Sequence, residues 1–150
     1  MKKVLFICHG NICRSPAAQI VFRDLVTKAG TAGNYHIESR ATSTEELGNP
    51  LYPPMRRALA QHGYALPAHT ARQITAKDCA EYDYLIIMDS RNRRGLVPFL
   101  GNNENKVSLL MEWAGESREV SDPWYSGDHE GALRDIEKGC RALFEALEKR

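Results

Sequence analysis

The chain has 150 residues, of which 43% are hydrophobic and 26% are charged. These values are typical of globular proteins, and the length favours a single domain, residues 1–150, with its own core. Twenty basic against 19 acidic residues give a net charge of +1, so no overall field attracts nucleic acid. No stretch is apolar for long enough to cross a membrane. We therefore expect neither a nucleic-acid nor a membrane partner.

The cysteines argue against a disulfide scaffold or a zinc site. Four of them, at positions 8, 13, 79 and 140, are too few to stabilise a chain of this size. Cys8 and Cys13 lack the second pair of ligands that a structural zinc ion needs, so we expect no metal. The apolar run at 4–7 follows two lysines but is too short for a signal peptide. A reduced, cytoplasmic protein is expected.

Predicted strands and helices alternate along the chain. The apolar run 3–7 predicts a strand buried on both faces, and a helix follows from about Ser15 to Ala29, with Ser15 as N-cap and Pro16 in its first turn. Further strands are expected at 35–42, 84–88 and 107–111, and further helices at 55–62, 76–82, 92–100 and 131–148, the last after a long loop, 112–130. This alternation is typical of a parallel sheet with right-handed crossovers.

We therefore expect an α/β fold, a single three-layer domain in which helices cover both faces of a four-stranded parallel sheet. In such sheets the ligand site lies beyond the carboxyl ends of the strands. Cys8, Asp89 and the loop after the fourth strand should meet there.

The loop between the first strand and the first helix predicts an anion site with a nucleophile at its floor. Its residues are Cys8, His9, Gly10, Asn11, Ile12, Cys13, Arg14 and Ser15. Gly10 and Asn11 tolerate the positive φ that turns successive N–H groups inward, and the helix N-terminus favours a phosphate. Arg14 adds a bidentate fork, and this positive field favours the thiolate form of Cys8. Ser15 could donate its hydroxyl to that thiolate.

The alternative is a buried cysteine and a surface arginine on a nucleotide-binding turn, because a cysteine and an arginine at this spacing also occur by chance. A dinucleotide site would need G-x-G-x-x-G at this loop, and a Walker loop would need Gly-Lys-Ser/Thr. The loop contains neither motif.

Four separate segments carry a resemblance to a known family. Cys8–Pro16 together with Asp122–Tyr125 (Asp-Pro-Trp-Tyr) resembles the low-molecular-weight protein tyrosine phosphatases. Ala68–Thr75 and Met88–Asp89 also resemble segments of that family. The similarity covers essentially the whole chain, in its length and in the order of its elements.

The resemblance implies a phosphatase that uses no cofactor. Cys8 would be the nucleophile that forms a phosphocysteine, while Arg14 and the amides of the loop, His9 to Ser15, would bind the phosphate. Asp122 would protonate the departing phenolate and then act as base toward water. By itself, Asp-Pro also fits an ordinary turn. The expected partners are phosphotyrosine-containing proteins, with inorganic phosphate as product inhibitor, and a monomer or weak homodimer is expected.

The resemblance also suggests how the cleft selects its substrate. Trp124 and Tyr125 would form an aromatic wall and Ile12 the opposite apolar wall, although one or both aromatic residues could instead pack in the core. Relatives specific for phosphoarginine carry threonine in place of Ile12, so phosphotyrosine is the favoured substrate.

Supporting roles are implied for residues outside the loop. Ser39 and His69 resemble positions that hydrogen-bond the loop asparagine, Asn11, although a histidine without such a role is the alternative. Asp89 is expected to orient the loop or Arg72. Cys13 would form a reversible disulfide that protects Cys8 from overoxidation.

Four other functions stay open. Phosphoarginine phosphatase is one, and a thiol-coupled arsenate reductase is another, although it would need two further cysteines close in sequence. A phosphocysteine carrier protein would not need the Asp-Pro-aromatic loop. A non-catalytic phosphotyrosine-binding module would not need an intact Cys8, Arg14 and Asp122.

Overall fold

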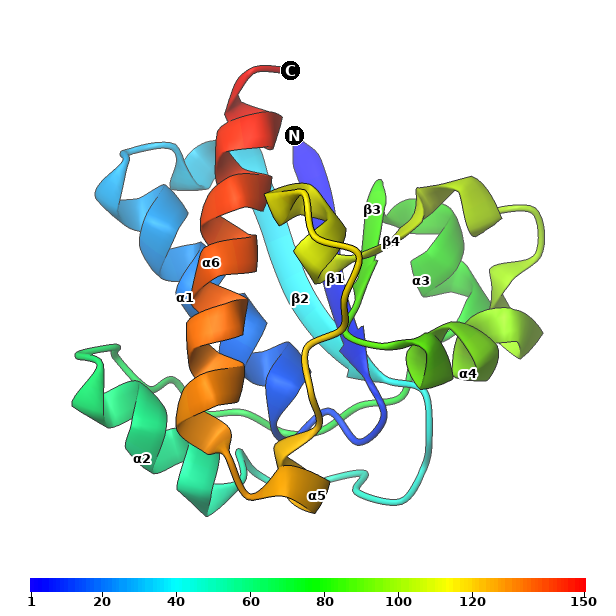
Figure 1. Cartoon of the computed structure of the whole chain (residues 1–150). Coiled ribbons are helices and arrows are strands. Elements are labelled where there is room, and N and C mark those ends of the chain that lie inside the picture. The colour runs from blue at the N-terminus through cyan, green and yellow to red at the C-terminus, as the bar shows by residue number, and fades with distance from the viewer.

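A computed structural model, which describes all residues 1–150, contains one four-stranded parallel sheet (Figure 1). The strand order is β2-β1-β3-β4, and the strands are β1 (Lys2–Cys8), β2 (Tyr35–Ala41), β3 (Tyr84–Ile87) and β4 (Val107–Leu109). β1 lies between two neighbours, which explains why its apolar run is buried without interruption from Val4 to Ile7.

Helices cover both faces of the sheet and leave its carboxyl edge for the loops. α1 (Arg14–Lys28) and α6 (His129–Glu148) cover one face, and α3 (Ala76–Glu81) and α4 (Ser90–Leu100) cover the other (Figure 1). α2 (Pro53–Gln61) packs against α6, and α5 (Pro123–Ser126) lies beyond the strand ends, opposite the two termini. Short 3-10 helices occupy Ala32–Asn34, Glu104–Lys106 and Leu110–Ala114. The predicted three-layer α/β fold is confirmed.

The side chains of β1 divide between two cores. Val4 and Phe6 face α1 and α6, where Phe22 packs 5.8 Å from Phe6 between ring centroids, while Leu5 and Ile7 face α3 and α4. This alternation follows from the period of two in a strand. Burying each of these side chains contributes about 1.5–3 kcal/mol, so the strand that ends at Cys8 is firmly held.

The segment after β4 packs closely against α6, and this packing depends on one glycine. A Cβ on Gly139 would lie 2.5 Å from Cγ of Leu110, which belongs to the 3-10 helix after β4. The glycine therefore allows the segment after β4 to contact the helix directly. This contact positions the chain that continues to α5.

Several predicted boundaries were wrong. α1 begins at Arg14 with Cys13 as N-cap, so Ser15 is not the cap, because its hydroxyl is engaged inside the loop. The fourth strand ends at Leu109, and 110–114 forms a 3-10 helix instead. α5 lies within the predicted loop 112–130, because Asp122 caps the four residues that follow it.

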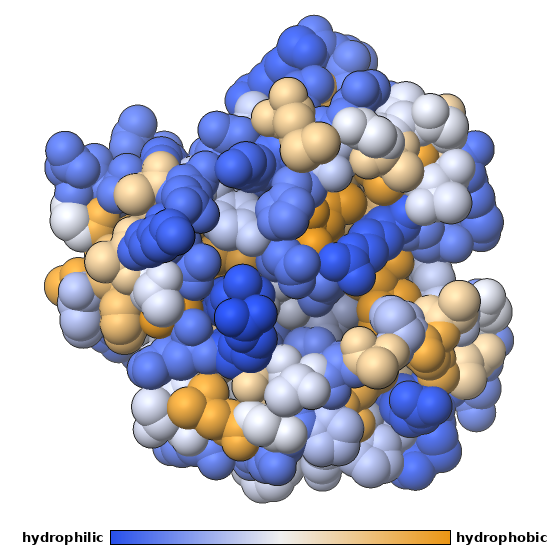
Figure 2. Space-filling view, turned by 180° about the vertical axis from the view of Figure 1, so that it is seen from behind, coloured by the Kyte–Doolittle hydropathy of each residue, from blue (hydrophilic) through white to orange (hydrophobic).

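No helix is both long and apolar enough to cross a membrane. Figure 2 shows the face opposite to that of Figure 1, where hydrophilic residues cover most of the surface and hydrophobic ones are interspersed among them.

Candidate active site

The sheet brings two sequence-distant residues to one edge. Cys8 ends β1 and Asp89 follows β3, and these two strands are neighbours whose register pairs Ile7 with Ile87. The carboxyl ends of parallel strands meet at the same edge, as the sequence predicted. The loop after Cys8 turns directly into α1.

Asn11 holds the backbone of this loop. It is the one non-glycine residue with a positive φ, 59°, and it is completely buried. Its amide nitrogen donates to the hydroxyls of Ser15 (2.8 Å) and Ser39 (2.9 Å), and its side-chain oxygen accepts from the N–H of Arg72 (3.1 Å). Its carbonyl accepts from Nε2 of His69 at 2.6 Å. The contacts expected of Ser39 and His69 are therefore present.

The thiol of Cys8 lies at the floor of a cleft beside a hydroxyl. Its Sγ is 3.0 Å from Oγ of Ser15, whose backbone N–H also donates to it at 3.4 Å. The Ser15 hydroxyl oxygen already accepts from Asn11, so its own proton is free to point at the sulfur. Such a donor stabilises negative charge on Sγ.

Arg14 is a buried cation between two carboxylates. Its Nη1 donates to Asp89 (2.7 Å) and to the carbonyl of Val120 (2.8 Å), and its Nη2 lies 3.4 Å from Oδ2 of Asp122. Burial opposes the charge, but Cys8, Asp89 and Asp122 together outweigh it and raise the pKa of Arg14. The guanidinium is therefore charged and fixed in direction.

The position of Asp89 corrects part of its predicted role. Its side chain pairs with Arg14 and not with Arg72, while its other oxygen accepts from the N–H of Asn92 and caps α4. Arg72 reaches the loop only through its backbone N–H. The sequence could not separate the two arginines, because both were expected near the same edge.

Asp122 combines a structural contact with a position facing Arg14. One carboxylate oxygen accepts from the N–H of Trp124 and caps α5, and the other lies toward the guanidinium. Trp124 and Tyr125 are 61% and 72% exposed, so the alternative that they pack in the core is wrong. The Trp124 ring lies 5.4 Å from that of Tyr52, between centroids.

These groups surround a cleft of about 190 Å³ that contains both the thiol and the aromatic side chains. Thirteen residues line it: Cys8, His9, Gly10, Ile12, Cys13, Arg14, Glu45, Glu46, Tyr52, Arg91, Asp122, Trp124 and Tyr125. Sequence reasoning assigned no role in the cleft to Tyr52 or Arg91. Arg91 lies a few residues after the end of β3. This position in the sequence was the one signal that Arg91 could line the cleft.

The remaining thiols differ from Cys8. All four cysteines are free, and burial, followed by the charge of Cys8, raises the pKa of the Cys13 thiol. Cys79 and Cys140 are completely buried, and burial raises the pKa of both. No group of three or more His, Cys, Asp or Glu side chains is arranged to hold a metal ion.

Fold and site together define a class of protein: a parallel α/β domain with a thiol in the loop between β1 and α1, close to a buried arginine that contacts an aspartate. The sequence model of the low molecular weight phosphotyrosine protein phosphatases matches residues 3–150. The chain belongs to this family.

Individual relatives agree with this assignment. The low molecular weight protein-tyrosine-phosphatase YfkJ of Bacillus subtilis is 34% identical, with 99% of this chain and 97% of that protein covered. The rat low molecular weight phosphotyrosine protein phosphatase is 39% identical, with 96% and 94% covered. The crystal structure of YfkJ superimposes with a TM-score of 0.95 at 34% identity, covering 99% of this chain and 96% of that one.

A structure from Streptococcus pyogenes, described as a low molecular weight protein tyrosine phosphatase, is 37% identical with a TM-score of 0.88, covering 98% and 93% of the two chains. The predicted family, fold class and enzyme class, a protein tyrosine phosphatase, are confirmed.

Proposed function

We propose that the chain hydrolyses phosphotyrosine in proteins, and aryl phosphates in general, through a phosphocysteine formed on Cys8. The observation that carries this proposal is one cleft in which the Cys8 thiol, the Arg14 guanidinium and the Asp122 carboxyl group meet below aromatic side chains. Family membership supports the phosphotyrosine substrate.

In the first step the Cys8 thiolate attacks phosphorus, so that an S–P bond forms while the bond between phosphorus and the tyrosine oxygen breaks. The loop amides and Arg14 donate to the equatorial oxygens of the loose transition state. Asp122, in its protonated form, gives its proton to the departing phenolate oxygen. Asp89 keeps Arg14 in place throughout, because it accepts a 2.7 Å hydrogen bond from Nη1.

In the second step a water molecule attacks the same phosphorus. Asp122, now a carboxylate, takes the proton of that water, an O–P bond forms and the S–P bond breaks. The released thiolate accepts a hydrogen bond from the Ser15 hydroxyl, whose oxygen lies 3.0 Å from the sulfur. The product is inorganic phosphate, which fits the same amides and should therefore inhibit competitively.

The walls of the cleft support an aryl substrate. Ile12 is half-buried in the lining, which also contains the exposed rings of Trp124 and Tyr125, and the Tyr52 ring lies 5.4 Å from that of Trp124. Apolar and aromatic side chains beside an anion site are complementary to a phosphorylated phenol. The apolar side chain of Ile12 and the ring of Trp124 favour the phenol ring of phosphotyrosine over the polar guanidinium of phosphoarginine.

The burial of Cys79 also distinguishes a phosphatase from an arsenate reductase. An arsenate reductase of this fold would relay a disulfide through further cysteines, but Cys79, on α3, is completely buried in the core on one face of the sheet, and Cys140 lies on the opposite face. This supports hydrolysis. The Cys8–Cys13 disulfide, the cytoplasmic location and the monomer or weak homodimer stay predictions.

The test is hydrolysis of two aryl phosphates, nitrophenyl phosphate and phenyl phosphate, with a metal chelator present. Cys8→Ser should abolish measurable turnover. Asp122→Asn keeps an oxygen that can cap α5 but cannot supply the proton, so it should slow phenyl phosphate by about 10²–10⁴-fold and nitrophenyl phosphate, whose leaving group needs no proton, much less.

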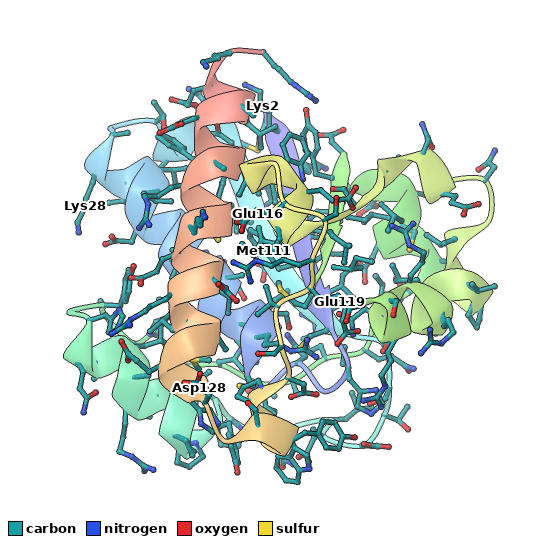
Figure 3. All side chains as sticks on the ribbon, viewed as in Figure 1. Lys2, Lys28, Met111, Glu116, Glu119 and Asp128 are labelled. Atoms are coloured by element: carbon teal, nitrogen blue, oxygen red, sulfur yellow. The ribbon has the colours of Figure 1, made fainter.

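Asp128→Asn is the matched control. Asp128 caps α6 close to α5 (Figure 3), but it does not line the cleft, so its variant should keep the wild-type rates. Turnover by Cys8→Ser at the wild-type rate would falsify the proposed mechanism.

A further inference from the structure

The mouth of the cleft has two sides of opposite charge. The loop after β2 contributes Glu45 and Glu46, and the start of α4 contributes Arg91. Both acidic side chains already have partners: Glu45 contacts Nε2 of His9 at 2.9 Å, and Glu46 accepts from Asn49 at 2.6 Å. Arg91, on the basic side, has one neutral partner, the Tyr125 hydroxyl, and forms no ion pair.

Arg91 is oriented by an aromatic residue rather than by a carboxylate. Its Nη1 donates to the Tyr125 hydroxyl at 3.3 Å, and its Cζ lies 5.7 Å from the centre of that ring. A guanidinium has five N–H donors, and only this one is used within the protein. The side chain is thus exposed and held beside the cleft, with donors to spare.

The nearest acidic groups are engaged elsewhere. Asp89 pairs with Arg14 and caps α4, and Asp122 faces Arg14 and caps α5. Glu119 approaches the start of α4 (Figure 3), where it accepts from the backbone N–H of Ser90 at 2.7 Å. None of the three forms an ion pair with Arg91. The hydrogen bond to Tyr125 and, more weakly, the charges of Asp89 and Asp122 raise the pKa of Arg91, so it stays charged at the mouth of the cleft.

A second exposed arginine on α4 extends the positive charge away from the cleft. Arg94 lies three residues after Arg91, on the same side of α4, and is exposed without an ion-pair partner. Together the two side chains form a positive strip that begins at Tyr125.

We infer that Arg91 makes this phosphatase select phosphotyrosine that is flanked by an acidic residue. The inference rests on the proposed function, because it needs the phosphate at Cys8 and the phenol ring between Ile12 and Trp124. With the ring held there, a residue next to the phosphotyrosine lies at the mouth, where its carboxylate meets the free fork of Arg91. Arg94 attracts a second acidic residue further along the peptide.

The experiment compares three phosphotyrosine peptides that differ only in their flanking residues, which are Glu, Gln or Lys. At low salt the wild type should hydrolyse the Glu peptide with a kcat/KM about 1.5- to fivefold above that of the Gln peptide, because the pair is exposed. The preference should fall as sodium chloride screens the charges.

Variants of Arg91 test whether this residue causes the preference for the Glu peptide. Arg91→Gln should reduce the Glu-to-Gln ratio to about one, and Arg91→Glu should invert the order so that the Lys peptide is hydrolysed best. Arg141→Glu is the charge-matched control: this exposed side chain on α6 does not line the cleft, so its variant should keep the wild-type ratio.

The outcomes separate the inference from the proposed function, since nitrophenyl phosphate has no flanking residues. Wild-type protein that hydrolyses nitrophenyl phosphate but treats the three peptides alike overturns the inference and leaves the function standing. The same holds if Arg91→Gln keeps the preference, or if Arg141→Glu loses it as completely as Arg91→Glu does. Wild-type protein that hydrolyses none of these compounds overturns both.

Discussion

At the scale of the residue, Asn11 shows how one side chain maintains a strained loop. Its left-handed backbone, at φ 59°, is compensated by hydrogen bonds to Ser15, Ser39 and Arg72. These bonds join β2 and the segment after α2 to the loop, so the anion site is prepared before a ligand binds. The Ser15 contact also connects Asn11 to the sulfur.

Asn11→Ala should destabilise the protein by about 2–4 kcal/mol, because it combines an unfavourable φ with the loss of buried hydrogen bonds. Asn11→Gly loses the same hydrogen bonds but tolerates the φ, and should therefore be about 1–2 kcal/mol more stable than Asn11→Ala. Urea unfolding measures both values. Equal stability of the two variants would show that the backbone conformation carries no cost.

At the scale of the element, a histidine joins α2 to α6. His62, just after α2, places Nδ1 3.1 Å from both oxygens of Glu137 and Nε2 2.6 Å from Glu130. Tyr64 also donates to Glu137, and Arg134 pairs with Glu130. A neutral imidazole can donate only once, so this geometry requires the imidazolium.

The hydrogen bond with Glu137 is the largest influence on His62, and despite the opposing effect of burial the pKa of His62 is raised. The folded protein therefore binds this proton more tightly than the unfolded chain does. The stabilisation is complete below the ordinary value of about 6.5 and is lost as pH rises through the folded pKa.

We expect the difference in unfolding free energy between wild type and His62→Gln to shrink as the pH is raised from about 6 through the folded pKa of His62. Urea unfolding at several pH values measures this difference, in which the titrations common to both proteins cancel. A difference that stays constant over this range would contradict the proposed ion pair.

At the scale of the whole molecule, the site is assembled from elements that meet only in the native fold. β1, β3 and the segment after the 3-10 helix at Leu110–Ala114 bring Cys8, Asp89 and Asp122 to one edge, while the two cores hold the sheet from both sides. An anion that binds there binds the folded state and not the unfolded chain.

Inorganic phosphate should therefore stabilise the protein, by about 2.7 kcal/mol at a concentration one hundred times its Kd. Thermal unfolding with phosphate, compared with sodium chloride at equal ionic strength, measures the effect. Cys8→Ser keeps the loop amides and Arg14, so it should be stabilised as well. An equal rise in Tm with chloride would exclude specific binding at the loop.

The sequence by itself determined the parallel α/β fold and the half of the site that is local. A buried strand, a loop that tolerates positive φ and a helix start follow one another from Lys3 to Pro16, so chain connectivity alone places Cys8 near Arg14. The Asp122 segment was identified by resemblance, and its contact with Arg14 is consistent with the role inferred for it.

Tertiary structure alone decided which side chains contact one another across the site. It paired Asp89 with Arg14 rather than with Arg72, and it brought Tyr52 and Arg91 to the cleft. The physical reason is that a hydrogen bond or ion pair between distant segments depends on which strand ends lie side by side. Local propensity and spacing carry no information about that choice.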